Sequence, residues 1–493
     1  MLDRPETKSH DIGFNFDNSY SALPKTLYKA TTPETPSNPC LIIYNDELGQ
    51  DLGLNGSGLS NEILCDLFSG ACLPEDSNVI SQAYAGHQFG GFTNLGDGRA
   101  HLLGEHVTPT GKRFDIQFKG SGRTPYSRSG DGKAALGPML REYIISEALH
   151  SLNIPTTRSL AVTTTGDPVV RQDILPGAVL TRIADSHIRV GTFQYLMAGG
   201  DTATLKKLAD YVINRHYSHL KASENPYQDL LKEVMARQID LIANWMRVGF
   251  IHGVMNTDNM LICGETIDYG PCAFMDHYDK DKVFSSIDRY GRYSFSNQPD
   301  MALWNLTRFA ETLLPLMDNT PAKAIEIAED ILKSFNDDFN TSWQTMMNAK
   351  LGLSDVRAED GSLVQQLLDW MHKSSVDYTN TFRDLSDDSA LHDTPYQSEN
   401  FKNWYRTFKE RQKSDSHSKG SPKDVMQQNN PVYIPRNHKV EEALYAAEVQ
   451  ADLTKFHEIL QVLKQPYREQ SQYSSYQLAP TKDQVVARTF CGT

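Results

Sequence analysis

The sequence predicts an α+β protein of two lobes, a strand-rich lobe followed by a helical one. Three observations support this fold class. The chain has 493 residues, more than one hydrophobic core usually holds. Strand-like segments are concentrated between residues 86 and 190. Beyond Asp201, apolar residues recur at helical spacing. Strands first and helices later is the order expected of an α+β chain.

The strand-rich part begins with a hairpin. Its strands are expected at Ala100–Val107 and Arg113–Phe118, separated by the turn-type sequence Thr108–Gly111. Apolar and polar residues alternate along the second strand, which places Lys119 on its polar face or just past its end. Two further strands are expected at 159–164 and 178–183, with a Gly-Asp-Pro turn at 166–168 between them.

Helices are expected where apolar residues recur every three to four positions. The first runs from Pro138 to Asn153, with a proline suited to its first turn. The later helices are expected at 205–219, 227–249, 301–314, 321–335 and 439–463. We therefore divide the chain into an N-terminal extension packing on the core (1–80), a strand-rich lobe (81–200), a helical lobe (201–410), a mobile linker (411–424) and a C-terminal helical segment with a tail (425–493).

Composition excludes several classes of function. A net charge of −14 disfavours nonspecific binding to nucleic acids or acidic membranes, and no apolar run approaches the length of a membrane helix. The first thirty residues show no signal or transit pattern, so we expect a cytoplasmic protein. Six cysteines without a C-x-x-C pair indicate neither a disulfide framework nor a zinc site.

A basic island interrupts the acidic chain between residues 112 and 141. Only Asp115 and Asp131 accompany its seven cations. The cations are Lys112, Arg113, Lys119, Arg123, Arg128, Lys133 and Arg141. Such a local excess of positive charge favours a small polyanion, for example a triphosphate.

Two short motifs within and beside this island suit phosphate binding. Gly96-Asp97-Gly98-Arg99 offers glycines that let the backbone approach a phosphate, and an arginine that can fork onto its oxygens. Lys119 at a strand end and Glu142 on the following helix match a phosphate-binding lysine held by a glutamate. Each motif also has a purely structural alternative. The glycine motif is then a simple turn, and Glu142 and Lys119 are solvated side chains at the surface of the lobe.

The most specific motif is the segment from His252 to Gly270, HGVMNTDNMLICGETIDYG. Protein-kinase-like folds place here a His-x-Asp, an Asn five residues after that Asp, an apolar strand and an Asp-Phe-Gly triplet. Asn259 and Asp268 fit the metal-binding positions and suit Mg²⁺ or Mn²⁺, and residues 260–263 fit the strand. Val254 stands where the catalytic Asp is expected.

Val254 cannot take a proton, which disfavours an ordinary protein kinase. Asp258 is the only carboxylate nearby on the loop, so we assign it the role of catalytic base. His252 is expected to brace the loop through hydrogen bonds, and metal binding is its alternative role. Residues 252–270 thus form the expected metal and catalytic loop of the helical lobe.

Four long segments resemble the selenoprotein O family, also called YdiU, over most of the chain. They are residues 84–105, 118–149, 180–194 and 252–260. That family is similar to protein kinases in fold but binds ATP in reverse, with the γ-phosphate buried and the α-phosphate presented for attack. The resemblance implies transfer of AMP from ATP to Ser, Thr or Tyr hydroxyls of proteins.

The resemblance also implies roles for individual residues. Glu142 would position Lys119, Asp258 would be the base, and Asn259 with Asp268 would hold the metal. The residues expected to contact the nucleotide are Gly96, Gly98, Arg99, Lys119, Asp131, Gly132, Arg182 and Arg189.

Cys491 lies third from the C-terminus, where some family members carry selenocysteine, so this chain resembles the cysteine-containing branch. We hypothesise that Cys491 pairs with Cys272 and links activity to redox state, because Cys272 follows the metal-binding triplet. A spare thiol on the tail is the alternative. The expected partners are ATP and protein substrates, some of them redox-related, with no nucleic acid and no membrane.

Three activities stay open at this point. The first is nucleotidyl transfer of AMP, and of UMP from UTP, because the proposed contacts are to phosphates and do not read the base. The second is phosphotransfer from the same loop. The third is a catalytically silent pseudokinase that binds ATP.

Overall fold

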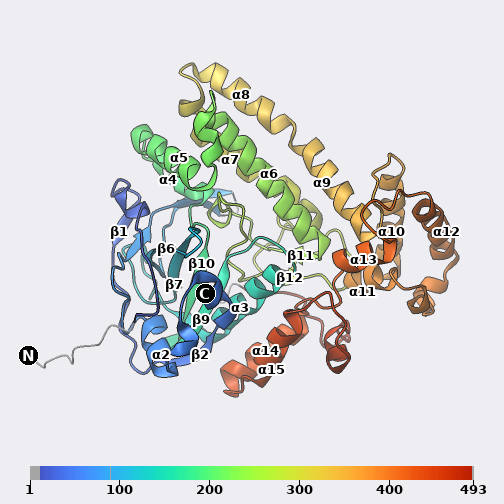
Figure 1. Ribbon diagram of the computed structural model, residues 1–493, viewed down its shortest axis with the longest axis horizontal. Helices are drawn as coiled ribbons and strands as arrows, with labels where there is room; N and C mark the ends of the chain where they lie inside the picture. The colour runs from blue at the N-terminus through green and yellow to red at the C-terminus, as the bar shows by residue number, and fades with distance from the viewer. Residues whose placement is uncertain (1–10, 89, 491–493) are drawn as a thin grey trace, which may run out of the picture.

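The computed structural model describes residues 11–88 and 90–490 and shows strands and helices in separate parts of the molecule (Figure 1). A large sheet lies on one side, and long helices extend away from it on the other. The predicted α+β class is therefore confirmed.

The main sheet contains eight strands in the order β1-β3-β6-β7-β10-β9-β2, with β8 paired to β10. All of its pairs are antiparallel. The strands are β1 (Tyr28–Ala30), β2 (Cys40–Tyr44), β3 (Ile80–Gln82), β6 (Ala100–Val107), β7 (Arg113–Lys119), β8 (Ala134–Ala135), β9 (Arg158–Val170) and β10 (Ile174–Ala184). Because β1 and β2 lie in this sheet, part of the expected N-terminal extension is built into it.

The register of the central strands places cationic side chains on one face. Lys119 at the end of β7 is opposite Leu180 of β10, and Gln117 is opposite Arg182. Residues two apart on a strand point to the same side, so Lys119 and Arg182 share a face. The predicted β6–β7 hairpin is confirmed at both strands.

Helix α3 (Leu136–Ser151) packs against β9 and β10. It begins two residues before the expected Pro138, which lies in its first turn, and most of its residues are buried. Glu142 is among the buried residues, so the carboxylate lies between the helix and the sheet. Two short helices, α1 (Asp46–Leu52) and α2 (Asn61–Ser69), precede the hairpin in the chain.

The turn expected at Gly166–Pro168 was placed wrongly. These residues lie inside β9, and the chain reverses at residues 171–173, where Arg171 N donates to Asp173 O. Gly166 has a φ of 76°, and the ladder with β10 carries a bulge between Pro176 and Ala178. A glycine in a bulge produces the same local sequence signal as a turn, because both need an unusual backbone conformation.

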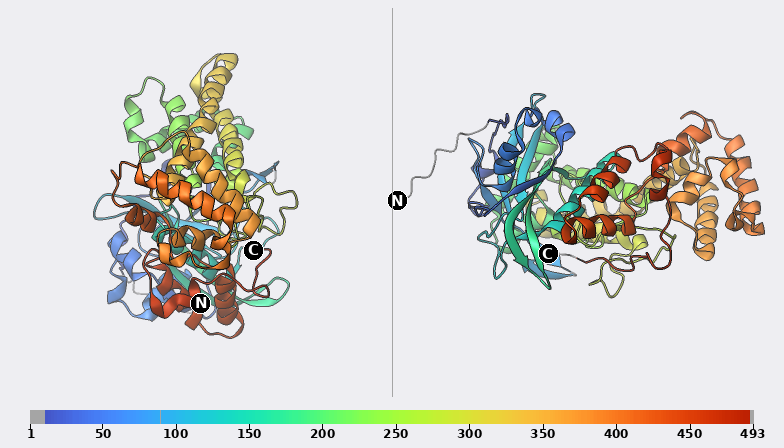
Figure 2. Two further views of the ribbon diagram at one scale, coloured as in Figure 1. Left: turned by 90° about the vertical axis from the view of Figure 1, so that its right-hand side faces the viewer. Right: turned by 90° about the horizontal axis from the view of Figure 1, so that it is seen from below.

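The remaining helices follow the sheet. They are α4 (Val190–Ala198), α5 (Thr202–His216), α6 (Pro226–Arg247), α7 (Gln298–Met317), α8 (Pro321–Lys333), α9 (Phe335–Lys350), α10 (Asp360–Ser374), α11 (Tyr378–Asp384), α12 (Glu399–Lys413), α13 (Pro422–Asn429), α14 (Asn437–Val449) and α15 (Thr454–Leu463). Helices α6 to α9 pack on one another, and α14 and α15 pack on α3 (Figure 2).

The single helix expected at 439–463 is in fact two, α14 and α15. Ala451 between them has a φ of 53°, which ends the first helix. Asp452 accepts hydrogen bonds from Thr454 N and Oγ1, and Thr454 is the first residue of the next helix. The apolar periodicity continues across the break, because both helices present apolar faces to α3.

Residues 411–424, expected to be a mobile linker, complete α12 and begin α13. Between the helices, buried Asp415 accepts hydrogen bonds from Ser354 N and Asp355 N.

Among the described residues, no helix combines the length and the apolar character that crossing a membrane requires.

Candidate active site

A cavity of about 1110 Å³ opens between α3, the sheet, the loop after β11 (Phe250–Ile251) and helix α14. It gathers twelve of the residues singled out from the sequence. They are Gly96, Gly98, Arg99, Lys119, Asp131, Gly132, Glu142, Arg182, Arg189, Asp258, Asn259 and Asp268. Segments that are up to about 170 residues apart in the chain therefore meet at one place.

Two carboxylates and two cations form a cluster in this cavity, in which Lys119, Glu142 and Arg182 are buried and Asp268 is partly exposed. Lys119 Nζ donates to Glu142 Oε2 at 2.6 Å and to Asp268 Oδ1 at 2.7 Å. Arg182 Nε donates to Glu142 Oε1, and its NH2 to Asp268 Oδ1, each at 2.7 Å. The predicted Lys119–Glu142 pair is thus present. Nearby cations hold the pKa of both carboxyls below their usual range, although burial alone would raise it.

Arg189 joins this cluster to the expected catalytic loop. Its NH1 donates to the main-chain oxygen of Asp258 at 2.9 Å and to Asp268 Oδ2 at 3.4 Å. The guanidinium lies 4.4 Å from the centre of the Tyr84 ring, which provides a cation–π contact. Arg182 and Arg189 are therefore buried cations of the site.

Asp97, inside the Gly96–Arg99 motif, is a site residue that we did not single out from the sequence. It is buried and accepts hydrogen bonds from Gln82 N and Gln117 Nε2, and one of its oxygens lies 3.8 Å from Arg189 NH2. Burial raises the pKa of Asp97 to about 6. Asp97 stands between two glycines, which is typical of an exposed turn, so the sequence did not indicate that it is buried.

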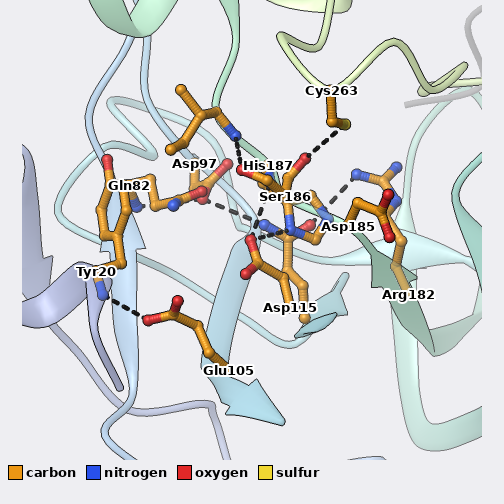
Figure 3. Close-up of polar contacts among 12 residues, drawn as sticks. Tyr20, Gln82, Asp97, Glu105, Asp115, Arg182, Asp185, Ser186, His187 and Cys263 are labelled. Carbon is orange, nitrogen blue, oxygen red and sulfur yellow. Dashed lines mark hydrogen bonds and ion pairs between the residues drawn. The ribbon is translucent and has the colours of Figure 1, made fainter. Parts of the chain in front are cut away.

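A second group of polar contacts anchors the segment that carries Arg189, and Figure 3 shows its members Asp115, Ser186 and His187. Asp115 accepts from His187 N at 2.9 Å and from His187 Nδ1 at 3.0 Å, and Arg215 NH2 also donates to it at 2.7 Å. Ser186 Oγ accepts from Ile188 N at 3.1 Å. These bonds hold residues 185–189 against the sheet and so orient the arginine.

The loop between β11 and β12 (Ala273–Phe274) carries the other expected functional groups. His252 Nδ1 accepts from Val254 N and its Nε2 donates to Ile267 O, so His252 braces the loop, as predicted. Asn259 Nδ2 donates to Val254 O at 3.0 Å, which leaves its Oδ1 as the atom that can bind a metal. The strand expected at 260–263 is absent from this described segment, which makes only an isolated bridge between Leu261 and Arg189.

Asp258 lies at the inner wall of the cavity in a short 3₁₀ helix (Thr257–Asn259). Its Oδ1 is buried and has no hydrogen-bond partner within the described part of the chain. Burial raises the pKa of Asp258 to about 6. A carboxylate with a raised pKa and a free oxygen is a stronger base than an ordinary aspartate.

The hairpin β4 (Ala85–Gln88) and β5 (Gly91–Asn94) covers this loop. His87 N donates to Thr257 Oγ1 at 2.8 Å. A Cβ on Gly86 would lie only 2.2 Å from Asp258 Oδ1, so the hairpin approaches the carboxylate as closely as a glycine allows.

Replacing Gly86 by Ala is expected to displace Asp258 and to lower transferase activity by about a hundredfold, because small misplacements of a catalytic group are costly. The matched control is Gly91→Ala in the same hairpin, where the new Cβ would meet nothing closer than 3.5 Å. Initial rates of transferase activity, measured for both variants, show whether Gly86 positions Asp258. Equal rates would show that the contact with Gly86 does not position Asp258.

The basic island divides into two parts in the structure. Lys119, Arg123, Arg128, Lys133 and Arg141 line the cavity, whereas Arg113 pairs with Asp17 outside it. Among the described residues, Arg99, Arg123 and Arg128 have no carboxylate partner within 4.0 Å, so they are free to meet a polyanion. Asp131 is paired with Arg171, which donates to both of its oxygens.

The expected pair Cys272–Cys491 cannot be placed, because Cys491 lies outside the described residues. Cys272 is buried, and its Sγ donates to Tyr269 O at 3.2 Å. Burial raises the pKa of the Cys272 thiol to about 12, so the thiolate that forms disulfides is disfavoured in this conformation.

The C-terminal segment, whose role the sequence did not reveal, forms one wall of the cavity. Helix α14 contributes Glu441, Leu444, Tyr445, Glu448 and Val449. It is held to α3 by a 2.7 Å ion pair between Arg141 and Glu441 and by Gly137 N donating to Glu448 Oε1 at 2.9 Å. No periodicity signal could have placed this helix beside the site, because the contact is between segments about 300 residues apart.

A cavity that gathers buried cations, carboxylates and an amide from the sheet and from one loop is typical of enzymes that handle phosphate groups. Comparison with known proteins identifies the family within this class of enzymes. Residues 11–464 match the family model described as protein adenylyltransferase SelO. The chain is 55% identical to a protein nucleotidyltransferase YdiU of Nitrosococcus oceani over 99% of both chains. It is 53% identical to that of Syntrophotalea carbinolica over 98% of both chains.

The chain belongs to the protein adenylyltransferase SelO family. The resemblance noted in the sequence is confirmed, and so is the enzyme class that it implied, a nucleotidyltransferase.

Proposed function

We propose that the chain transfers AMP from ATP to Ser, Thr or Tyr hydroxyls of proteins and releases pyrophosphate. The observation that carries the proposal is the position of Asp258. Asp258 lines the same cavity as the cluster of Lys119, Arg182 and Asp268, and its Oδ1 is buried without a hydrogen-bond partner among the described residues, whereas Val254 takes the place of a kinase's catalytic Asp. The family description supports the identity of the transferred group.

We further propose a protein-kinase-like fold of two lobes, with ATP bound in the reverse orientation. The sheet with α3 is the first lobe and nucleotide-binding part, and the helices from α6 onward are the second. A buried triphosphate needs fixed cations rather than water around it. Arg182 and Arg189 are buried, and Arg99, Arg123 and Arg128 line the same cavity without carboxylate partners among the described residues.

Asn259 and Asp268 are proposed to hold Mg²⁺ or Mn²⁺. One amide oxygen and one carboxylate are hard ligands that suit these ions, which take much of their shell from water and phosphate. Among the described residues, no group of three or more His, Cys, Asp or Glu is arranged for metal binding. When bound, the metal would supply positive charge for the phosphate oxygens.

The residues of the chain then have distinct roles in the reaction. Asp258 accepts the proton of the acceptor hydroxyl, whose oxygen forms a bond to the α-phosphorus of ATP. The bond from that phosphorus to the bridging oxygen breaks, and pyrophosphate leaves with the electron pair. Lys119, Arg182 and Arg189 are placed to stabilise the charge on the phosphate oxygens, while Glu142 holds Lys119 in position.

Two further proposals concern partners. The nucleotide contacts proposed above are to the phosphates and the metal, and none is to the base. UTP is therefore an expected second substrate, from which UMP would be transferred. Redox-related proteins in the cytoplasm are the proposed acceptors, with the pair Cys272–Cys491 as the proposed redox link.

The products of the reaction test the proposal. Purified protein is incubated with ATP, Mg²⁺ or Mn²⁺ and an acceptor protein, and the acceptor is analysed by intact mass spectrometry. We expect an increase equal to one AMP group and release of pyrophosphate. An increase equal to one phosphoryl group, with ADP as the product, would favour phosphotransfer. Binding of ATP without any modification would favour a pseudokinase.

Restoring the aspartate that is typical of kinases at position 254 offers a second test. Val254→Asp is expected to give no phosphotransfer, because reversed ATP keeps its γ-phosphate away from the acceptor. Assays with γ-labelled ATP and an acceptor protein measure this directly, with the unaltered chain as control. Appearance of phosphorylated acceptor would argue against the reversed orientation.

A further inference from the structure

The mouth of the cavity carries an apolar patch that the reaction described above does not use. Four large apolar side chains line the cavity yet are mostly exposed: Ile287 (55%), Tyr445 (59%), Val449 (60%) and Phe490 (69%). We call these four residues the mouth patch. An exposed cluster of large apolar side chains beside a site is characteristic of an interaction surface.

The mouth patch is held in place by contacts beneath it, although its side chains face outward. Tyr445 and Val449 lie on α14, which the Arg141–Glu441 ion pair ties to α3. Ile287 and Phe490 lie next to a short parallel pairing, in which Ser286 N donates to Thr489 O and Thr489 N donates to Phe284 O. Thr489 Oγ1 also donates to Pro271 O, three residues after Asp268.

This pairing joins the last described residues of the chain to the segment that follows the metal-binding triplet. The four mouth-patch residues therefore come from three separate parts of the chain that are each held by hydrogen bonds or ion pairs, and they line the cavity that also holds Asp258. A surface that is already ordered binds a partner with less loss of entropy than a flexible one.

A nucleobase is one candidate occupant of the patch. Sites for small molecules bury most of the ligand surface between enclosing walls. The mouth-patch side chains are more than half exposed, so a flat base lying on them would stay largely in water. An acceptor protein, in contrast, must cross the mouth for its hydroxyl to reach Asp258, and it would cover these side chains as it does so.

We propose that the mouth patch binds the residues flanking the acceptor hydroxyl, and that the preferred acceptor is an extended segment with a bulky apolar residue beside a Ser, Thr or Tyr. This inference rests on the proposed function. Glu448 lies between Tyr445 and Val449 on α14 and forms no ion pair among the described residues, so an acidic residue beside the acceptor hydroxyl is disfavoured by charge. An extended segment allows the hydroxyl to reach inward while its neighbours contact the rim.

The test uses the full chain, α-labelled ATP and synthetic peptides. The peptides carry one Ser, Thr or Tyr, and each flanking position is varied among Leu, Phe, Ser, Lys and Glu. We expect the highest kcat/KM for peptides with Leu or Phe beside the acceptor and the lowest for those with Glu.

A pair of variants assigns this preference to the mouth patch. The double variant Tyr445→Ser/Val449→Ser is expected to lower kcat/KM for apolar-flanked peptides by roughly tenfold, because apolar contact area is lost, and to leave ATP affinity unchanged. The matched control is Ile325→Ser/Val356→Ser, which removes two comparably exposed apolar side chains (45% and 55%) that do not line the cavity. This control is expected to behave like the unaltered chain.

Several outcomes would overturn the inference, and they are separable from failure of the proposed function. Equal labelling of all peptides, or equal rates for the two double variants, would show that the patch does not select acceptors. Loss of ATP affinity in the mouth-patch variant would show that the patch holds the base. Labelling of intact proteins but of no peptide would exclude recognition of an extended segment. Absence of α-label from both peptides and proteins would overturn the proposed function itself.

Discussion

Replacing Asp258 by Asn is expected to lower kcat for AMP transfer by about 10²–10⁴-fold, the usual contribution of a general base. The amide keeps the shape of the side chain but cannot accept the proton of the acceptor hydroxyl. ATP affinity should change little, because the contact from Arg189 is to the main-chain oxygen of Asp258 and not to its carboxylate. Single-turnover rates and calorimetric titration with ATP measure the two quantities.

The stability of this variant distinguishes a catalytic residue from a structural one. Burial raises the pKa of Asp258 to about 6, so above its unfolded-state pKa the folded protein disfavours the ionised carboxylate. Removing that charge should raise the free energy of unfolding at pH 7, by about 1–2 kcal/mol. Lower stability together with lower activity would show that Asp258 is mainly structural. Denaturant unfolding provides this measurement.

Replacing Asp268 by Asn is expected to remove activity and to destabilise the protein. Lys119 and Arg182 each lie 2.7 Å from its Oδ1, and Arg189 lies 3.4 Å from its Oδ2, so the variant leaves three buried cations facing a neutral amide. Breaking a buried ion pair in this way costs about 3–5 kcal/mol. The rate should fall by at least about a hundredfold, because the amide is also a poorer metal ligand.

Asn is the appropriate replacement at this position for a backbone reason. Asp268 has a φ of 63°, a conformation that Asn adopts more easily than most residues. The substitution therefore tests charge and not backbone strain. Unfolding free energy and the dependence of the rate on Mg²⁺ concentration are measured together. Unaltered stability with unaltered activity would contradict the assigned role, and Asn259→Ala, which removes no charge, is the control for metal binding alone.

Elements with a local signal could be predicted from the sequence. The second strand of the β6–β7 hairpin alternates apolar and polar residues after a turn sequence, α6 has apolar residues at helical spacing, and α3 has a proline suited to its first turn, so their bounds were close. Prediction failed where the same local sequence pattern is compatible with two different structures. Gly166 marks a bulge and not a turn, and the periodicity of 439–463 continues across the break at Ala451.

Site residues could be predicted where their chemical type and their spacing in the sequence both matched what a phosphate site needs. Lys119, Glu142 and Asp268 were identified because a phosphate site needs a cation, its partner and a metal ligand, and the structure brings all three within hydrogen-bond distance. Asp97 was missed because the glycines on either side gave the signal of a turn, and because its burial arises from contacts with other elements, among them Gln82 of β3 and Gln117 of β7. The wall formed by α14 was missed for the same reason, since contacts across 300 residues leave no local pattern.

The most direct measurement follows the label of ATP into protein. The full chain is incubated with an acceptor protein and ATP labelled at either the α- or the γ-phosphate, with Asp258→Asn as the inactive control. Transfer of AMP predicts that label from the α-phosphate enters the acceptor and that label from the γ-phosphate is recovered as pyrophosphate. Incorporation of the γ-label alone would contradict this account.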